Sequence, residues 1–161
     1  MTTQTPVSGN RREISFVTID DALGDVGAIE NAERAGRARC VGNWSTGQIL
    51  NHLATWADYS FDGMPLHPPF IIRLMLRPMK GRFLYKKMRA GGSIPKVPGG
   101  TLAIGPASLE DGLAHFRKSF ARLRDQTPTA PHVIFGRLTH DQWINMHLRH
   151  AELHLSFVRM D

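Results

Sequence analysis

The chain has 161 residues, of which 42% are hydrophobic and 21% charged, a balance that fits one globular domain and excludes a disordered or fibrous chain. Twenty lysine and arginine residues against fourteen acidic ones give a formal net charge of +6, which raises the question of an anionic partner. A single cysteine excludes an internal disulfide framework and is typical of a protein of the reducing cytoplasm, where we expect this chain to reside.

The first residues are polar and lack the apolar core that a signal peptide needs. We therefore expect residues 1–13 to form a flexible tail and residues 14–161 to form a single domain. The most apolar run, from Phe70 to Leu76, is interrupted by Arg73 and is too short to cross a bilayer.

Apolar side chains recur with helical spacing in four segments, and each segment begins at a residue that can cap a helix. Two of these starts, Ser45 with Gln48 and Thr139 with Gln142, match a capping box, in which the two side chains bond each other's backbone N–H groups. Residues 33–43 read as a helix end and loop, and no alternating strand pattern of useful length appears. The sequence therefore predicts an all-α four-helix bundle, whose helices begin at Thr18, Ser45, Ser108 and Thr139, with the last extending to near Arg159.

The segment between the second and third helices, residues 63–107, differs in composition from the rest of the chain. From Gly63 to Leu109 there are seven of the ten prolines, eight basic residues and no acidic residue, so the remainder carries twelve basic and fourteen acidic residues. We expect one or two short basic helices, with Pro69 at the start of the first and Pro78 breaking it, followed by a Gly/Pro loop over 91–106. The positive charge is thus confined to one basic, Pro/Gly-rich insertion.

The basic insertion admits four interpretations. The simplest is a solvated basic surface over an apolar anchor, and the favoured functional one is a lid that attracts an anionic small molecule. A membrane-surface helix ranks below these, on the apolar and arginine residues that follow Phe70. Nucleic-acid binding ranks last, because the chain contains no recognised nucleic-acid-binding motif.

The chain has eight histidines, and three of them, His147, His150 and His154, lie within roughly 60° of one another on the last helix. They share their stripe with apolar residues, so their imidazoles should point into the core, and His52 has the equivalent place on the second helix. Two histidines at i and i+4 can reach one metal ion, and a third from a facing helix leaves a tetrahedral position open. A lone core histidine is usually only hydrogen-bonded, but this number on facing stripes favours a metal site.

Other catalytic patterns are less well supported. Glu152 lies two residues from both His150 and His154 and so points to another side of the helix, which excludes the H-E-x-x-H arrangement of zinc proteases. Cys40 has no helix start or basic partner in the sequence to activate it, and we interpret it as structural. Tyr59 and Trp143, with Trp56, are candidates to line a pocket, although core packing explains such aromatic residues equally well.

Two stretches of the sequence form a recognisable pair: Gly42 to Leu53, at the start of the second predicted helix, and Trp143 to Phe157, in the last. They resemble the start of the second helix and the last helix of the DinB/YfiT-like superfamily of metal-dependent four-helix bundles, in a branch described only as a domain of unknown function. The chain departs from the superfamily at Leu155-Ser156-Phe157, where an Arg-Gly-Gln run is common.

The resemblance implies a divalent metal, with zinc first and nickel or iron as alternatives, bound by His52, His150 and His154. His147 falls outside this set and is left as a supporting residue, an alternative ligand or a substrate contact. Relatives of this type are often dimers, and some transfer a low-molecular-weight thiol that binds the metal as thiolate. We therefore expect a metal-dependent thiol S-transferase or related hydrolase acting on a small molecule, or else a non-catalytic bundle that binds a metal or small ligand.

Overall fold

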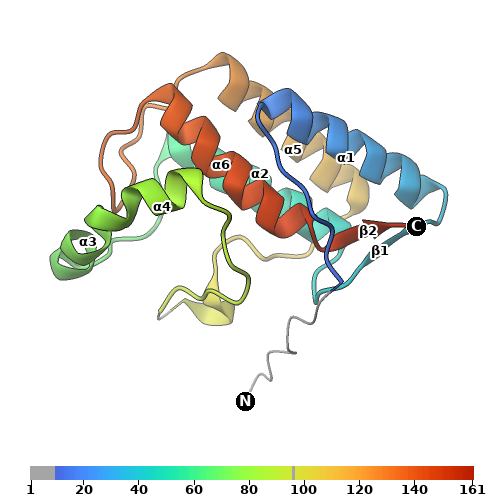
Figure 1. Ribbon diagram of the computed structural model, residues 1–161, viewed down its shortest axis with the longest axis horizontal. Coiled ribbons are helices and arrows are strands. Elements are labelled where there is room, and N and C mark those ends of the chain that lie inside the picture. Colours follow the sequence, from blue (N-terminus) through green and yellow to red (C-terminus); the bar gives the residue numbers. More distant parts are fainter. Residues whose placement is uncertain (1–9, 96) are drawn as a thin grey trace.

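The computed structural model describes residues 10–95 and 97–161, and the chain is mostly helical over these residues (Figure 1). Of the expected tail, residues 1–9 lie outside the described part of the chain. The elements in chain order are α1 (Ile19–Arg34), β1 (Ala38–Cys40), α2 (Thr46–Asp62), α3 (Phe70–Leu76), the 3-10 turn η1 (Arg77–Met79), α4 (Lys80–Tyr85), the 3-10 turn η2 (Pro98–Gly100), α5 (Leu109–Asp125), α6 (His140–Leu155) and β2 (Val158–Met160).

The four long helices begin where the sequence predicts, because their first backbone N–H groups are satisfied by side chains. Ser45 accepts a hydrogen bond from the backbone N–H of Gln48, whose side chain bonds back, and Thr139 and Gln142 repeat this box at the start of α6. Helix α1 has a third box that was not predicted from the sequence, and Ser108 caps α5. Because each cap sets the residue at which its helix begins, it also determines which side chains face the core.

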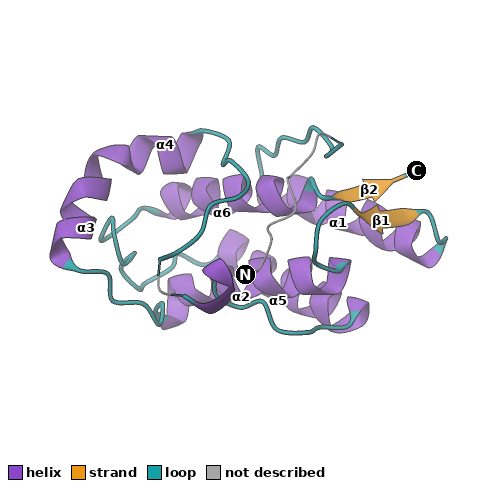
Figure 2. Cartoon of the chain, turned by 90° about the horizontal axis from the view of Figure 1, so that it is seen from below, coloured by secondary structure: helices purple, strands orange, loops and turns teal. Residues whose placement is uncertain are grey.

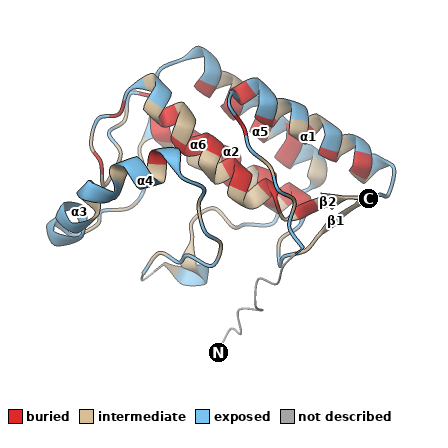
Figure 3. Ribbon diagram, in the orientation of Figure 1, coloured by how far each residue is buried: buried red, intermediate tan, exposed pale blue. Residues whose placement is uncertain are grey.

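Helix α2 is the central element of the core. It packs most extensively against α5 and also against α6, while α1 lies against α5 and α6 (Figure 1). The buried residues lie on the facing sides of these helices (Figure 3) and include large side chains from all four, such as Ile29, Leu53, Phe116 and Leu148. The predicted apolar stripes are thus confirmed as the core-facing sides.

The end of the chain differs from the expectation of a helix that runs to near Arg159. Helix α6 ends at Leu155, and β2 pairs antiparallel with β1, with Cys40 opposite Val158. The stretch expected as loop over 33–43 therefore contains a strand. Each strand has three residues, too few to show an alternating pattern, and their pairing joins segments more than a hundred residues apart in sequence.

Arg12 anchors the described end of the segment expected to be a flexible tail. Its guanidinium donates two hydrogen bonds of 2.8 Å to the carboxylate of Asp25 on α1, and its Nε donates to the carbonyl oxygen of Val158. These bonds tie the N-terminal segment to α1 and to the strand pair. A guanidinium that donates two hydrogen bonds to one carboxylate is held in a single orientation. A flexible tail would not hold it in this way.

Over its described residues, the basic segment 63–107 forms the two short helices α3 and α4 and a loop that includes η2, as the sequence predicts. Pro78 lies in the 3-10 turn that separates α3 from α4, and α4 packs against α6. Leu84 of α4 is buried, and the ring centroid of Phe83 lies 5.6 Å from that of Phe135, in the segment before α6. Helix α3 extends away from the core at the end of the molecule opposite β1 and β2 (Figures 1 and 2). No helix in the described part of the chain is long and apolar enough to cross a membrane.

The crossing of α2 and α5 depends on two glycines. A Cβ placed on Gly112 would lie 2.6 Å from the carbonyl oxygen of Gly47, closer than real Cβ contacts allow. Both glycines are buried in the first turns of their helices, so these turns approach each other backbone to backbone. This contact fixes the position of the helix that carries His52.

We expect Gly112→Ala to lower the free energy of unfolding by about 1–3 kcal/mol, because the added methyl group forces two backbones apart. Gly24→Ala is the matched control: Gly24 is exposed in the middle of α1 with nothing within 4 Å of where a Cβ would lie, and alanine there should stabilise by up to about 1 kcal/mol. Urea unfolding of both variants measures the difference. Equal stabilities for the two variants would contradict the close backbone contact.

Candidate metal centre

Three histidines from two helices converge at one point in the core. The ring nitrogens that His52, His150 and His154 can offer a metal ion all lie within 4.8 Å of one another. The Nε2 atoms of His52 and His150 are 3.2 Å apart. Two nitrogens bound to one tetrahedral zinc ion at roughly 2.0–2.1 Å lie about 3.3 Å apart, so this spacing suits a shared ion. Over residues 10–95 and 97–161, no carboxylate or thiol joins this group.

Local sequence places each imidazole. His52 lies in the middle of α2 and is fully buried, in a register that the capping box at Ser45 sets. His150 and His154 are one helical turn apart on α6, with ring centroids 4.7 Å from each other. The contact between α2 and α6 brings the two sides of the group together.

Burial keeps these imidazoles neutral. Desolvation lowers the pKa of His52 to about 4 and that of His154 to about 3, and the pKa of His150 lies well below its usual value for the same reason. The neighbouring imidazoles lower the pKa values of His150 and His154 further. A neutral imidazole has a free lone pair, so all three rings are in the protonation state that binds a metal near neutral pH.

A backbone carbonyl sets the tautomer of His52. Nδ1 of His52 lies 2.9 Å from the carbonyl oxygen of Leu102, and since a carbonyl can only accept, Nδ1 must carry the proton. In a neutral ring the Nε2 lone pair is then free and faces His150. Metal-binding histidines usually donate their other N–H to such an acceptor. Leu102 belongs to the loop of the basic insertion, which therefore reaches the histidine group.

Tryptophan rings enclose the three histidines. Trp44 stacks on His154 with ring centroids 5.2 Å apart and planes 8° from parallel, and it also contacts His52. Trp56 lies 5.2 Å from His150, and Tyr59 follows behind Trp56 at 6.4 Å. Trp56 and Tyr59 were predicted from the sequence. Trp44 was missed, although its position immediately before the Ser45 cap could have identified it.

His147 and Trp143 belong to a different cluster. The Nε2 atom of His147 is 2.6 Å from the hydroxyl oxygen of Ser60, and the His147 ring stacks on Trp143. The ring of His132 also contacts that of Trp143, with ring centroids 5.7 Å apart. Ser60, Trp143 and His147 are buried, and desolvation lowers the pKa of His147 to about 3. The structure therefore does not bring His147 and Trp143 into the group formed by His52, His150 and His154.

Glu152 and Cys40 are engaged elsewhere. Glu152 is buried and accepts a hydrogen bond from the backbone N–H of Phe16 while pairing with Arg149, so it is turned away from the histidines as the sequence predicts. The Sγ atom of Cys40 lies 3.3 Å from the hydroxyl of Thr46, and burial raises the pKa of the thiol. A raised thiol pKa disfavours the reactive thiolate.

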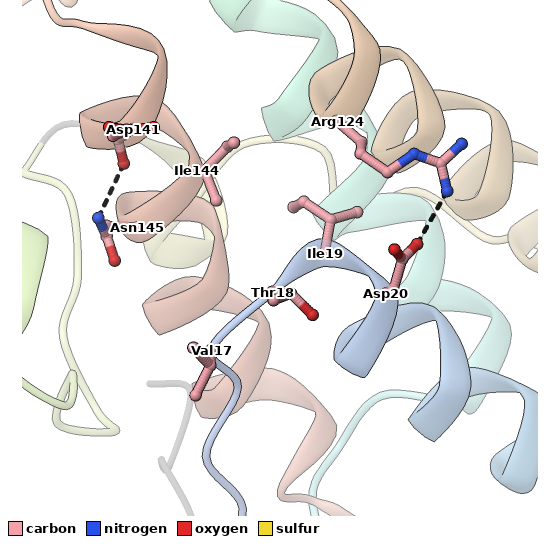
Figure 4. Close-up of a pocket in the computed structure, with 8 residues that line it drawn as sticks. All are labelled: Val17, Thr18, Ile19, Asp20, Arg124, Asp141, Ile144 and Asn145. Carbon is pink, nitrogen blue, oxygen red and sulfur yellow. Dashed lines mark hydrogen bonds and ion pairs between the residues drawn. The ribbon is translucent and has the colours of Figure 1, made fainter.

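A depression on another part of the surface is not lined by His52, His150 or His154. It lies between the start of α1 and the helices α5 and α6, and Asp20 and Arg124 pair across its edge at 2.8 Å (Figure 4). Its lining contains no histidine or cysteine and is open to solvent. The residues that line it are Val17, Thr18, Ile19, Asp20, Arg124, Asp141, Ile144 and Asn145.

Comparison with known proteins gives one family. A family model described as protein of unknown function (DUF1569) matches residues 9–161, which is nearly the whole chain. No curated protein and no solved structure matches it.

Acid should destabilise the metal-free protein from pH 6.5 downward. Burial holds the pKa of His147 at about 3 in the folded protein, whereas in the unfolded chain it titrates near 6.5. The unfolded chain binds more protons between these values, so each such histidine lowers the free energy of unfolding by up to about 1.4 kcal/mol per pH unit of decrease. Urea unfolding across this range measures the slope. His147→Gln should reduce it and the exposed-site control His67→Gln should not; equal slopes would contradict burial of a neutral His147.

Proposed function

The chain belongs to the DUF1569 family, and we propose that His52, His150 and His154 bind a divalent metal ion that makes this protein a metal-dependent enzyme. The observation that carries the proposal is the convergence of three neutral imidazoles within 4.8 Å. Zinc is the first choice, and nickel or iron also suit an all-imidazole site. Three protein ligands leave a coordination position for water or substrate, as in catalytic rather than structural zinc sites.

The donor set fits such an ion on three counts. The rings are neutral, since burial lowers the pKa of His52 to about 4 and that of His154 to about 3. The Nδ1–H of His52 is held by the carbonyl of Leu102, so its Nε2 lone pair is available. The Nε2 atoms of His52 and His150 are 3.2 Å apart, so a proton on His150 or a cation must separate their lone pairs.

The architecture supports assignment to the DinB/YfiT-like superfamily. Four long helices, α1, α2, α5 and α6, pack around one core, and the histidines come from the two that correspond to the superfamily's metal-binding helices. In this proposal the chain is a four-helix bundle with the basic segment inserted between its second and third helices. Bundle cores commonly build metal sites from side chains on facing helices.

The proposed reaction is the transfer of a low-molecular-weight thiol to an electrophilic small molecule. A bound divalent ion lowers the pKa of a thiol or water and so supplies a nucleophile near neutral pH. Trp44 and Trp56 would exclude bulk water and offer flat apolar faces to the substrate. The hydrogen bond from His52 to Leu102 holds the imidazole in one orientation. The basic insertion would favour thiols or acceptors that carry carboxylates.

A non-catalytic metal-binding or small-ligand-binding bundle is the second candidate. The observation that favours it is that, among the described residues, the group contains three histidines and no carboxylate that could act as a general acid or base. Hydrolases with a three-ligand zinc site often use such a group, whereas thiol transfer depends less on one. A related hydrolase is therefore the weaker form of the enzyme proposal.

We expect protein purified without a histidine tag to contain one divalent metal ion per chain, measured by mass spectrometry of the metal. His150→Ala should lower metal affinity by more than about 100-fold, because it removes a ligand rather than a supporting hydrogen bond. His67→Ala changes an exposed histidine and should keep the full metal content. Absence of stoichiometric metal, together with unchanged stability of His150→Ala, would overturn the metal site.

Turnover separates the two candidate functions. Metal-loaded protein is offered a panel of low-molecular-weight thiols with an electrophilic acceptor, and loss of free thiol is followed. The enzyme proposal predicts turnover that falls to the uncatalysed rate in His52→Ala and persists in His67→Ala. Thiol binding without turnover, detected by calorimetry, would instead identify the non-catalytic bundle.

A further inference from the structure

Large hydrophobic side chains are exposed together in one short part of the molecule. Of the eight that are exposed among the described residues, seven lie between residues 70 and 85, and the eighth is Val17. Helix α3 is almost uniformly exposed (Figure 3), and among the described helices and strands its substantial contacts are with the adjoining turn η1. The seven are Phe70, Ile71, Ile72, Leu74, Met75, Met79 and Tyr85.

The exposed apolar residues of α3 form one continuous face. Phe70 and Met75 are each 71% exposed, Ile71 is 67% and Leu74 is 54%. At about 100° per residue these four cover an arc of roughly 140°. Ile72, at 41%, lies outside this arc and is the least exposed of the α3 residues in the exposed set. An apolar face of this width on a soluble domain marks a contact surface.

Basic side chains border this apolar face. Arg73 and Arg77 lie one turn apart on one flank of α3, and both are exposed. Lys80 and Arg82 continue the positive charge along α4, and Lys86 and Lys87 follow directly after its end. Together with Arg73 and Arg77 these are six basic residues, none of which takes part in an ion pair with another described residue. No acidic residue occurs between Gly63 and Leu109. The surface therefore lacks the negative charges that would neutralise it from within.

An exposed apolar face bordered by basic side chains favours one kind of partner. A second copy of the chain, seated face to face on α3, would bring two sets of positive charges together without compensation. A nucleic acid would match the charge but would leave a continuous apolar face without a binding role. A lipid surface with anionic head groups matches both, because the apolar side chains enter the acyl boundary while the arginine and lysine ends remain among the phosphates.

We propose that α3 and the basic side chains around it form a docking site for an anionic lipid surface. The site lies on the membrane without crossing it, since α3 has seven residues. Helix α4 packs against α6, the helix that carries His150 and His154, and the docking face on α3 is joined to α4 through the turn η1. The same segment continues into the loop whose Leu102 carbonyl contacts His52. Docking of this face does not require a metal ion at the histidines.

Vesicle sedimentation tests the docking site. The full chain is mixed with vesicles of phosphatidylcholine alone, or of equal parts phosphatidylcholine and phosphatidylglycerol. Binding to the anionic vesicles is expected, with weakening at high salt, and little binding to the neutral ones. Ile71→Gln with Met75→Gln should weaken binding at least about tenfold, because two exposed apolar anchors are lost. Arg73→Gln with Arg77→Gln should weaken it about tenfold through lost charge.

Matched controls change comparable residues elsewhere. Val17→Gln alters the one exposed large hydrophobic residue outside the segment among the described residues, and Lys118→Gln removes an exposed charge on α5; both should bind as the unaltered protein does. Circular dichroism verifies that every variant is folded. Undiminished binding by Ile71→Gln with Met75→Gln would overturn the proposal. So would a dimer that these substitutions dissociate in the absence of vesicles, or duplex DNA binding at equal affinity that depends on Arg73 and Arg77.

Discussion

The contact between the imidazoles of His52 and His150 is the constraint on which the candidate metal centre depends. Two polar rings from different helices meet with their Nε2 atoms 3.2 Å apart, in a place where burial keeps both uncharged. Burying polar groups in this way costs free energy unless each nitrogen has a partner. The Leu102 carbonyl satisfies one nitrogen of His52. A metal ion would satisfy the lone pairs that face one another, which makes metal binding and the stability of this core interdependent.

Contacts elsewhere in the helices determine where the three histidines lie. The glycine contact between Gly47 and Gly112 brings α2 and α5 together backbone to backbone, which determines where His52 lies. The side-chain cap at Thr139 sets the register of α6, and thus the direction in which His150 and His154 point. A change of one residue in either register would turn an imidazole by about 100° and separate the group.

Local patterns in the sequence predicted the helices and the candidate ligands, because caps and stripes act within a few residues. Ser45 with Gln48 indicated the start of α2, and the spacing of His150 and His154 indicated two neighbours on one helical face. Features that depend on distant pairing were not predicted. The stacking of Trp44 on His154, the strand pair and the bond from His52 to Leu102 each join segments that no periodicity connects.

X-ray absorption spectroscopy at the edge of the bound metal tests the proposed metal centre most directly, since it reports the ligands themselves. For zinc, we predict a first shell of nitrogen and oxygen at roughly 2.0–2.1 Å with the multiple scattering of three imidazoles, reduced to two in His52→Ala. In protein prepared without any added thiol, a shell containing sulfur at about 2.3 Å would contradict it, and so would a three-imidazole spectrum that His52→Ala leaves unchanged.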